Sequence, residues 1–199
     1  MELNFKKEYI LENDNVRLNL LKLEDISNLI EFSINEPEIW KYSLVKASGK
    51  ENLENYIKTA IKEKSSKKSY PFIVFDKHKE KFCGTTRFYN IDIKNKCLSI
   101  GYTWYGKEFR GTGINKNCKF LLLEFAFETL NMERVEFRAD KDNITSINAM
   151  KSIGCKEEGV LRSNMFKPDG GRRDSIILSI IKREWNNGIK DMLSKKVNR

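Results

Sequence analysis

The residues of this sequence best suited to chemistry form a short turn with two glycines, Arg110-Gly111-Thr112-Gly113-Ile114-Asn115. An apolar run at residues 97–104, expected to be a strand, precedes the turn, and an apolar stretch of helical spacing at residues 114–130 follows it. The first amides of a helix have no partner within the helix and carry partial positive charge, and glycine lets the backbone approach an anion because it has no Cβ. The turn therefore predicts a site for a phosphate-bearing ligand.

The spacing of the turn disfavours two familiar phosphate-binding loops. The pattern G-x-x-x-x-G-K-[ST] fits Gly106 and Gly111, but Thr112-Gly113 stand where Lys and Ser or Thr are required. The dinucleotide pattern G-x-G-x-x-G fits Gly111 and Gly113, but Lys116 stands at the third glycine. A nucleoside triphosphatase or a nicotinamide-dependent enzyme is therefore disfavoured.

A second group of residues follows in the pattern N-x-x-S-x-x-x-M-x-x-x-G, formed by Asn143, Ser146, Met150 and Gly154. Asn is a favoured N-cap and Gly a favoured terminator, so residues 143–154 are expected to be a helix. Asn143 and Ser146 then share its first turn, whereas Met150 is expected to be a core residue.

Together with the stretches LKLEDISNLIEF and IGYTW, the two groups resemble the GNAT acetyltransferase superfamily, and in particular its RimJ/RimL-like branch. The resemblance covers nearly the whole chain. It implies one GNAT N-acetyltransferase domain over residues 1–199 and an α+β fold of three layers, with a mixed, mostly antiparallel sheet between helices. It also implies acetyl-CoA as the cosubstrate and no metal.

The resemblance further implies which residues contact acetyl-CoA. The amides of the turn would grip its diphosphate, with Lys116 and Lys119 adding positive charge, and the strand before the turn would pair with the pantetheine arm. Asn143 would lie near the pantetheine or the sulfur. The cofactor-binding residues expected on this basis are Tyr102, Thr103, Trp104, Arg110, Gly111, Thr112, Gly113, Ile114, Asn115 and Asn143.

For catalysis, the resemblance makes Ser146 the residue that protonates the departing thiolate. The general base is missing at both places where relatives carry a glutamate, because Ser99 and Met165 stand there. Glu136 and Asp140 are the carboxylates in or beside the next strand, and alternation along the strand does not decide which face Glu136 occupies. Asn143 and Ser146 also have plain structural interpretations, as a helix cap and a first-turn serine.

The missing base favours an acceptor amine of low pKa. At pH 7 an α-amine with a pKa near 8 is roughly 10% neutral, whereas a lysine amine is neutral only about 0.04% of the time. We therefore expect direct attack by an α-amine or another low-pKa amine in a ternary complex, with its proton lost through bound water.

The acceptor pocket is expected between the early helices and the last strand pair. By analogy with the branch, its substrate-binding candidates are Trp40, Tyr42, Phe166 and the turn PDGGRRD. Within this turn, Arg172 and Arg173 are expected to meet an acidic group on the acceptor. The sequence leaves the acceptor open among a protein N-terminus, a polyamine, an amino acid and an amine-bearing antibiotic. A catalytically silent regulatory module that binds acetyl-CoA is the alternative, because both expected glutamates are absent.

Composition narrows the remaining function classes. The 199 residues carry a net charge of +9, but the lysines are scattered, so nucleic acid is a disfavoured partner. The four cysteines form no CxxC pair and are expected to be buried free thiols, and the single histidine, His78, is expected at an exposed hairpin tip. With no apolar run long enough for a membrane and no signal peptide pattern, we expect a cytoplasmic protein. Whether it forms a homodimer stays open.

The elements that must position these residues follow from hydrophobic periodicity. A strand is expected from residue 16 to 20 and a short helical turn over 37–43, with hairpins over 70–92 and 156–185. A strand is also expected at 97–104 and another at Arg134–Asp140. The expected helices cover residues 26–34, 51–64, 114–130 and 143–154.

Overall fold

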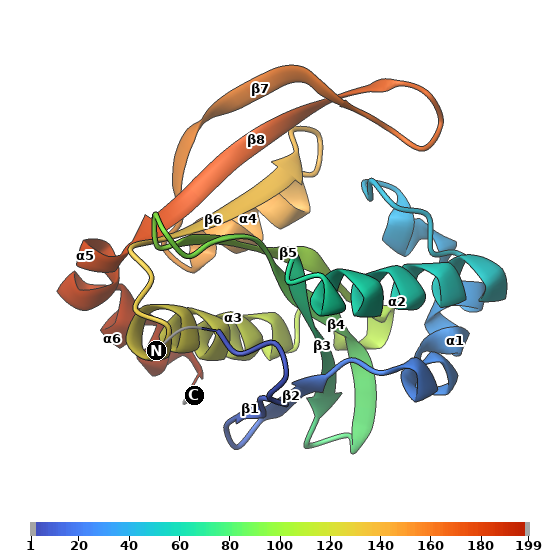
Figure 1. The fold of residues 1–199 in the computed structure, drawn as a ribbon, viewed down its shortest axis with the longest axis horizontal. Coiled ribbons are helices and arrows are strands. Elements are labelled where there is room, and N and C mark those ends of the chain that lie inside the picture. The colour runs from blue at the N-terminus through green and yellow to red at the C-terminus, as the bar shows by residue number, and fades with distance from the viewer. Residues whose placement is uncertain (1–2, 198–199) are drawn as a thin grey trace.

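Alternating apolar residues build a central sheet, which the computed structural model shows for the described part of the chain, residues 3–197 (Figure 1). Val16 and Leu18, for example, are completely buried on one face of a five-residue strand. The sheet has eight strands in the order β1-β2-β3-β4-β5-β6-β8-β7. The strands are β1 (Leu11–Glu12), β2 (Val16–Leu20), β3 (Ser69–Asp76), β4 (Lys81–Asp92), β5 (Cys97–Tyr105), β6 (Arg134–Asp140), β7 (Lys156–Phe166) and β8 (Arg172–Ile181).

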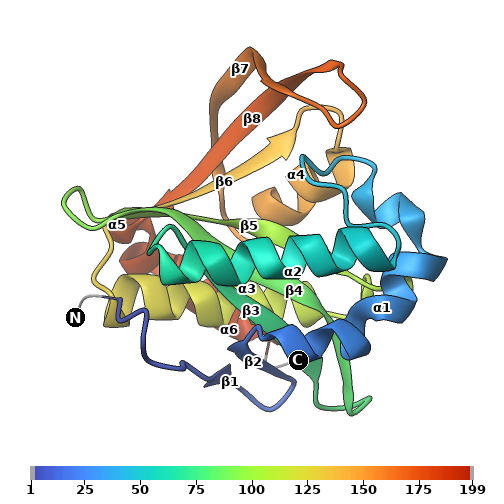
Figure 2. The same ribbon diagram turned by 45° about the vertical axis from the view of Figure 1, so that its right-hand side comes forward.

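Helices cover both faces of this sheet, which confirms the expected α+β architecture (Figure 2). One apolar cluster packs the first helices against the sheet through residues such as Leu29 and Ile57, and a larger cluster on the other face includes Cys118 and Leu122. The helices are α1 (Ile26–Asn35), α2 (Lys50–Ser65), α3 (Ile114–Glu124), α4 (Ile144–Ser152), α5 (Lys182–Glu184) and α6 (Lys190–Val197), with a 3-10 turn at Pro37–Trp40 and π-helical turns at Phe125–Thr129 and Trp185–Ile189.

The strands β5 and β6 form the one parallel pair recorded among the strands of residues 3–197, and they pair only at their beginnings. Cys97, Leu98 and Ser99 face Arg134–Glu136, after which β5 pairs only with β4 and β6 only with β8. A bulge bends β5 where its register with β4 shifts, and Tyr102 there has a φ of 51°. The two strands diverge in both views, so their facing edges keep unpaired backbone groups (Figures 1 and 2).

The end of the chain differs from the expected long strand at residues 172–185. β8 ends at Ile181, and residues 182–197 are helical. The reason is Trp185, which is completely buried and stacks on Phe127 with ring centroids 5.6 Å apart, while its Nε1 donates to Glu128 Oε1 at 2.9 Å. Trp185 therefore lies beneath α3, out of the plane of the sheet. A strand that continued to residue 185 would keep this side chain in the sheet and away from its burial site.

Candidate functional site

The glycine turn lies at the exposed start of α3, at the end of the sheet where β5 finishes. Gly111 and Gly113 have φ values of 78° and 92°, the left-handed region that favours glycine. The first helical bond runs from Asn117 N to Gly113 O at 3.1 Å, and Thr112 Oγ1 donates to Phe109 O at 2.7 Å. Within residues 3–197, no backbone amide of residues 111–116 donates a hydrogen bond to another protein group. Six adjacent donors are therefore free for an anion.

The cations near the turn are arranged differently from the sequence-based expectation. Arg110 is exposed but tethered, since its Nε donates to Tyr105 O at 3.0 Å. Lys119, expected to add charge at the phosphates, instead points under the sheet and is 5% exposed. Its Nζ donates to Thr103 Oγ1 at 2.7 Å and to Thr86 Oγ1 at 3.4 Å, and burial lowers its pKa to about 8. Because it faces inward, Lys119 is a core-facing cation and not part of the loop.

The diverging part of β5 presents the residues expected along the pantetheine arm. The carbonyl of Tyr102 turns toward α2 and accepts the Tyr56 hydroxyl at 3.3 Å. Thr103 is half-buried and held by Lys119, and Trp104 is buried with no hydrogen-bond partner for its Nε1 in the described chain. The bulge thus leaves the edge of β5 that faces β6 without a protein strand beside it.

The start of α4 brings Asn143 and Ser146 together, as the spacing predicts. Asn143 Oδ1 accepts the backbone amide of Ser146 at 3.0 Å, so the capping role is confirmed. Asn143 Nδ2 and the Ser146 hydroxyl bond to no other group of residues 3–197, and both residues are half-buried. Ile147 and Met150 are buried in the core. Each polar residue therefore keeps a donor for a ligand.

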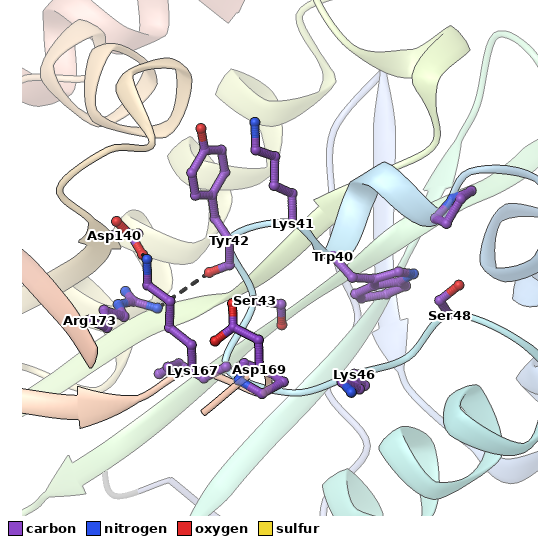
Figure 3. A pocket seen from close by; sticks show the side chains of 13 residues that line it. Trp40, Lys41, Tyr42, Ser43, Lys46, Ser48, Asp140, Lys167, Asp169 and Arg173 are labelled. Atoms are coloured by element: carbon purple, nitrogen blue, oxygen red, sulfur yellow. Dashed lines mark hydrogen bonds and ion pairs between the residues drawn. The ribbon is translucent and has the colours of Figure 1, made fainter. Parts of the chain in front are cut away.

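A pocket of about 310 Å³ lies beside this helix start (Figure 3). Trp40 reaches β5 by packing on Trp104 with ring centroids 5.0 Å apart, and Asp140, the last residue of β6, lies three residues before the cap of α4 at Asn143. The pocket thus adjoins both the strand and the helix expected to hold the cosubstrate. It is lined by Pro37, Trp40, Lys41, Tyr42, Ser43, Leu44, Lys46, Ser48, Asp140, Lys167, Pro168, Asp169 and Arg173.

The structure brings two of the three aromatic substrate-binding candidates into this pocket. Trp40 and Tyr42 line it, whereas Phe166 is 70% exposed and lies outside it, under the guanidinium of Arg172 at 4.2 Å from the ring centroid. The pocket also contains Arg173, one of the two arginines expected to meet an acidic group on the acceptor, whereas Arg172 does not line it. Alternation along β8 shows that Arg172 and Arg173 face opposite ways, but not which of them meets the loop of residues 37–48.

The carboxylates that the sequence left open have different surroundings. Glu136 is paired with Arg134 at 3.0 Å and Arg138 at 2.6 Å, and it does not line the pocket. Asp140 is 3% exposed and lines the pocket, where its Oδ2 is 3.4 Å from Lys167 Nζ and its Oδ1 accepts the amide of Asp142 at 3.0 Å. Of the two, Asp140 is the carboxylate that an acceptor in the pocket would meet.

Other site classes find no support in the described residues. Among residues 3–197, no three His, Cys, Asp or Glu side chains gather into a group that could hold a metal ion. Within the same range, no helix is both long and apolar enough to cross a membrane.

The cysteines and the histidine lie much as the sequence predicts. Cys83, Cys118 and Cys155 are buried free thiols, and Cys97 is a half-buried one. His78 lies in the exposed β3–β4 turn, with Nε2 2.7 Å from Asn15 Oδ1.

Comparison with known proteins matches residues 15–156 to a family model described as an acetyltransferase (GNAT) domain. The chain is 30% identical over 181 residues to the "Putative ribosomal N-acetyltransferase YdaF" of Bacillus subtilis (strain 168), covering 87% of this chain and 94% of that protein. A GCN5-related N-acetyltransferase from Brucella melitensis has a similar fold, with a TM-score of 0.87, 23% identity and coverage of 95% and 85%. So does a ribosomal-protein-S5-alanine acetyltransferase from Vibrio fischeri, with a TM-score of 0.72, 19% identity and coverage of 89% and 98%.

Proposed function

The chain belongs to the GNAT acetyltransferase family, and from this premise we propose that it moves the acetyl group of acetyl-CoA to the primary amine of an acceptor held in the Trp40–Tyr42 pocket. The observation that carries the proposal is the row of six free amides at residues 111–116, beside two strands that diverge next to the pocket. A diphosphate at the row and a pantetheine arm between the strands would satisfy these unpaired groups.

The residues present fit acetyl-CoA, which supplies the acetyl group as an activated thioester. The amides of residues 111–116 would hold the diphosphate, and the glycines at positions 111 and 113 let them approach its oxygens. The free edge at Tyr102, Thr103 and Trp104 would align the pantetheine arm by main-chain hydrogen bonds. Asn143 Nδ2 would donate to the same arm, since its Oδ1 is already used by the helix cap.

For the chemistry, we assign the transfer of one proton to Ser146. The neutral amine forms the new N–C bond, the C–S bond breaks, and the Ser146 hydroxyl gives its proton to the thiolate. Bound water returns a proton to Ser146, balanced by the proton that the amine loses. The amine loses its own proton to bound water, which favours an α-amine because its pKa is close to neutral pH. Asp140, at the wall of the pocket, would attract the ammonium form of the acceptor before this step.

A protein N-terminus or a small-molecule amine is the acceptor class that we propose. The name of YdaF, which contains the words ribosomal N-acetyltransferase, supports the first of these. Lys41 and Lys46 at the wall of the pocket are exposed to solvent, which agrees with either acceptor.

The proposal is tested by titration calorimetry with acetyl-CoA and then by thiol release over a library of amines. Valine disfavours the left-handed φ at position 113, and its side chain would lie beside the amides of residues 111–116. The substitution Gly113→Val is therefore expected to lower acetyl-CoA affinity at least about tenfold. Gly188→Val is the matched control, because Gly188 also has a positive φ, 124°, in the C-terminal segment.

Intact affinity in Gly113→Val would place the diphosphate elsewhere. Binding of acetyl-CoA without thiol release on any amine would instead favour the silent regulatory module, for which the absence of a glutamate at Ser99 and Met165 already argues.

A further inference from the structure

Arg173 is a buried cation that lines the pocket and lacks a carboxylate partner. It is 6% exposed, and no carboxylate of residues 3–197 comes within 4.0 Å of its guanidinium. Its Nε donates to Ser175 Oγ at 3.0 Å and its Nη1 to the carbonyl of Tyr42 at 3.4 Å, while Nη2 bonds to no described residue. Arginine stays charged even when buried, so the cost of removing this charge from water is only partly offset within the protein.

The other charges of the pocket offset this guanidinium only in part, although the nearby carboxylate of Asp140 attracts it. Asp140, the buried carboxylate nearby, has Lys167 within 3.4 Å and already accepts a backbone amide. Asp169 accepts the amide of Gly171 at 2.9 Å and is exposed. Lys41 and Lys46 add positive charge at the wall. The pocket therefore has four cationic side chains and two carboxylates, and of the four cations only Lys167 has an ion pair in the described chain. Arg173 is the most buried of the three cations without one.

The pocket presents both a carboxylate and an unpaired cation, which suits a ligand that carries both charges. Arg173, Asp140 and Lys167 lie together on one side of the pocket, and Trp40 lies on the other side (Figure 3). An acceptor amine would meet Asp140, close to the cap of α4, while an anionic group on the same acceptor would meet Arg173. The guanidinium suits a carboxylate, because its planar donors match the two carboxylate oxygens.

We propose that the acceptor is a primary amine that carries a carboxylate, and that Arg173 binds this carboxylate. The inference rests on the proposed function and specifies its acceptor. A pocket of about 310 Å³ is at the small end of ligand sites, so it admits a group of the size of one amino-acid residue. The carboxylate belongs either to a free amino acid or to an acidic first residue of a peptide, and the experiment distinguishes the two sources.

The test uses matched probes that differ in one carboxylate: L-phenylalanine against L-phenylalaninamide, and the amidated peptide Asp-Ala-Ala against Asn-Ala-Ala. Binding is followed by tryptophan fluorescence, to which Trp40 in the pocket contributes, and turnover by thiol release with acetyl-CoA. We expect the charged member of at least one pair to bind roughly 10- to 100-fold more tightly, the range for a hydrogen bond to a charged group. The pair that shows the difference identifies the source of the carboxylate.

Variants assign the preference to one side chain. Arg173→Met is expected to abolish it and Arg173→Lys to restore part of it, with acetyl-CoA affinity unchanged in both. Arg172→Met is the matched control, since the neighbouring Arg172 is exposed and its Nε bonds to Ser163 Oγ at 2.9 Å. Its preference should equal that of the unmodified protein.

The proposal is overturned if the members of both pairs bind equally, if no carboxylate probe binds, or if the preference survives in Arg173→Met. Charge-selective binding without thiol release on any amine would uphold the role of Arg173 and refute acetyl transfer. Thiol release on amines without any preference for a carboxylate would uphold acetyl transfer and refute the role of Arg173.

Discussion

Ser146 and Asn143 show how two side chains in one helical turn can serve structure and ligand together. The cap uses Asn143 Oδ1 and the amide of Ser146, which leaves the Asn143 Nδ2 and the Ser146 hydroxyl free. Lys119 shows the opposite case, a charged residue that the core absorbs through the hydroxyls of Thr103 and Thr86. At the scale of single residues, the donors that remain unpaired therefore mark the site better than residue type does.

Ser146→Ala is expected to lower kcat with little change in acetyl-CoA affinity. The loss should be about 10- to 100-fold, at or below the lower end of the range for a general acid, because a thiol leaves more readily than poorer leaving groups. Steady-state kinetics and calorimetry measure the two quantities. Ser152→Ala is the control, because Ser152 ends the same helix and its Oγ donates to Ala149 O at 2.7 Å. Unchanged turnover in Ser146→Ala would reduce this residue to an ordinary helix serine.

At the scale of elements, the site depends on where helices begin and where two strands separate. The bulge at Tyr102 turns β5 away from β6 after three paired residues, and α3 and α4 begin at the same end of the sheet. The glycine turn begins α3, and Asp140 ends β6. Because these features are ends of rigid elements, they can hold donors in place before a ligand arrives.

Replacing Asn143 separates the cap from the contact with the cosubstrate. Asn143→Asp keeps an oxygen for the Ser146 amide and loses only the Nδ2 donor, so stability should be retained while acetyl-CoA affinity falls. Asn143→Ala loses both, and its free energy of unfolding should fall by about 1 kcal/mol. Urea unfolding and calorimetry on both variants measure these effects. Full affinity in Asn143→Asp would leave Asn143 with the capping role alone.

At the scale of the whole molecule, the site is assembled where several segments meet. The same fold also buries ionisable groups outside the pocket. The pocket combines the loop of residues 37–48, the end of β6 and the β7–β8 turn. Beneath the sheet, burial lowers the pKa of Lys119 to about 8, and partial burial raises the pKa of Tyr89 to about 12. Both groups couple folding to pH in the alkaline range, with opposite signs.

The contribution of Lys119 should destabilise the fold at neutral pH and fade on alkalinisation. Below about pH 8 the buried lysine is charged and the fold bears the whole penalty. Between about pH 8 and the ordinary pKa of 10.5, the folded protein loses this proton before the unfolded chain does, so stability rises with pH. The stability of Lys119→Met relative to the unmodified protein should therefore be greater at pH 7 than at pH 10, by about 2 kcal/mol.

Urea unfolding of both proteins at the two pH values measures this difference, and the contribution of Tyr89 cancels because both proteins contain it. Lys116→Met is measured as the control, because it replaces a half-exposed lysine on the same helix. A pH-independent difference between Lys119→Met and the unmodified protein would contradict the buried charge.

The sequence by itself determined the local features. Periodicity placed most of the helices and strands, including β6 with both of its bounds, and the two glycines located the turn before α3, because these signals depend on neighbouring residues alone. The residue types of the second block likewise predicted the cap at Asn143. Roles for the cofactor-binding residues followed only from resemblance, and they stay predictions.

Only the tertiary structure decided which faces meet. Period and spacing show that side chains share a face, but not what that face packs against, so Lys119 was expected beside the diphosphate and is instead buried under the sheet. In the same way, Trp185 ended the last strand because its burial site lies beneath α3. Asp140 and Arg173 became pocket residues because distant segments converge there, and such convergence is set by the packing of the whole sheet and its helices.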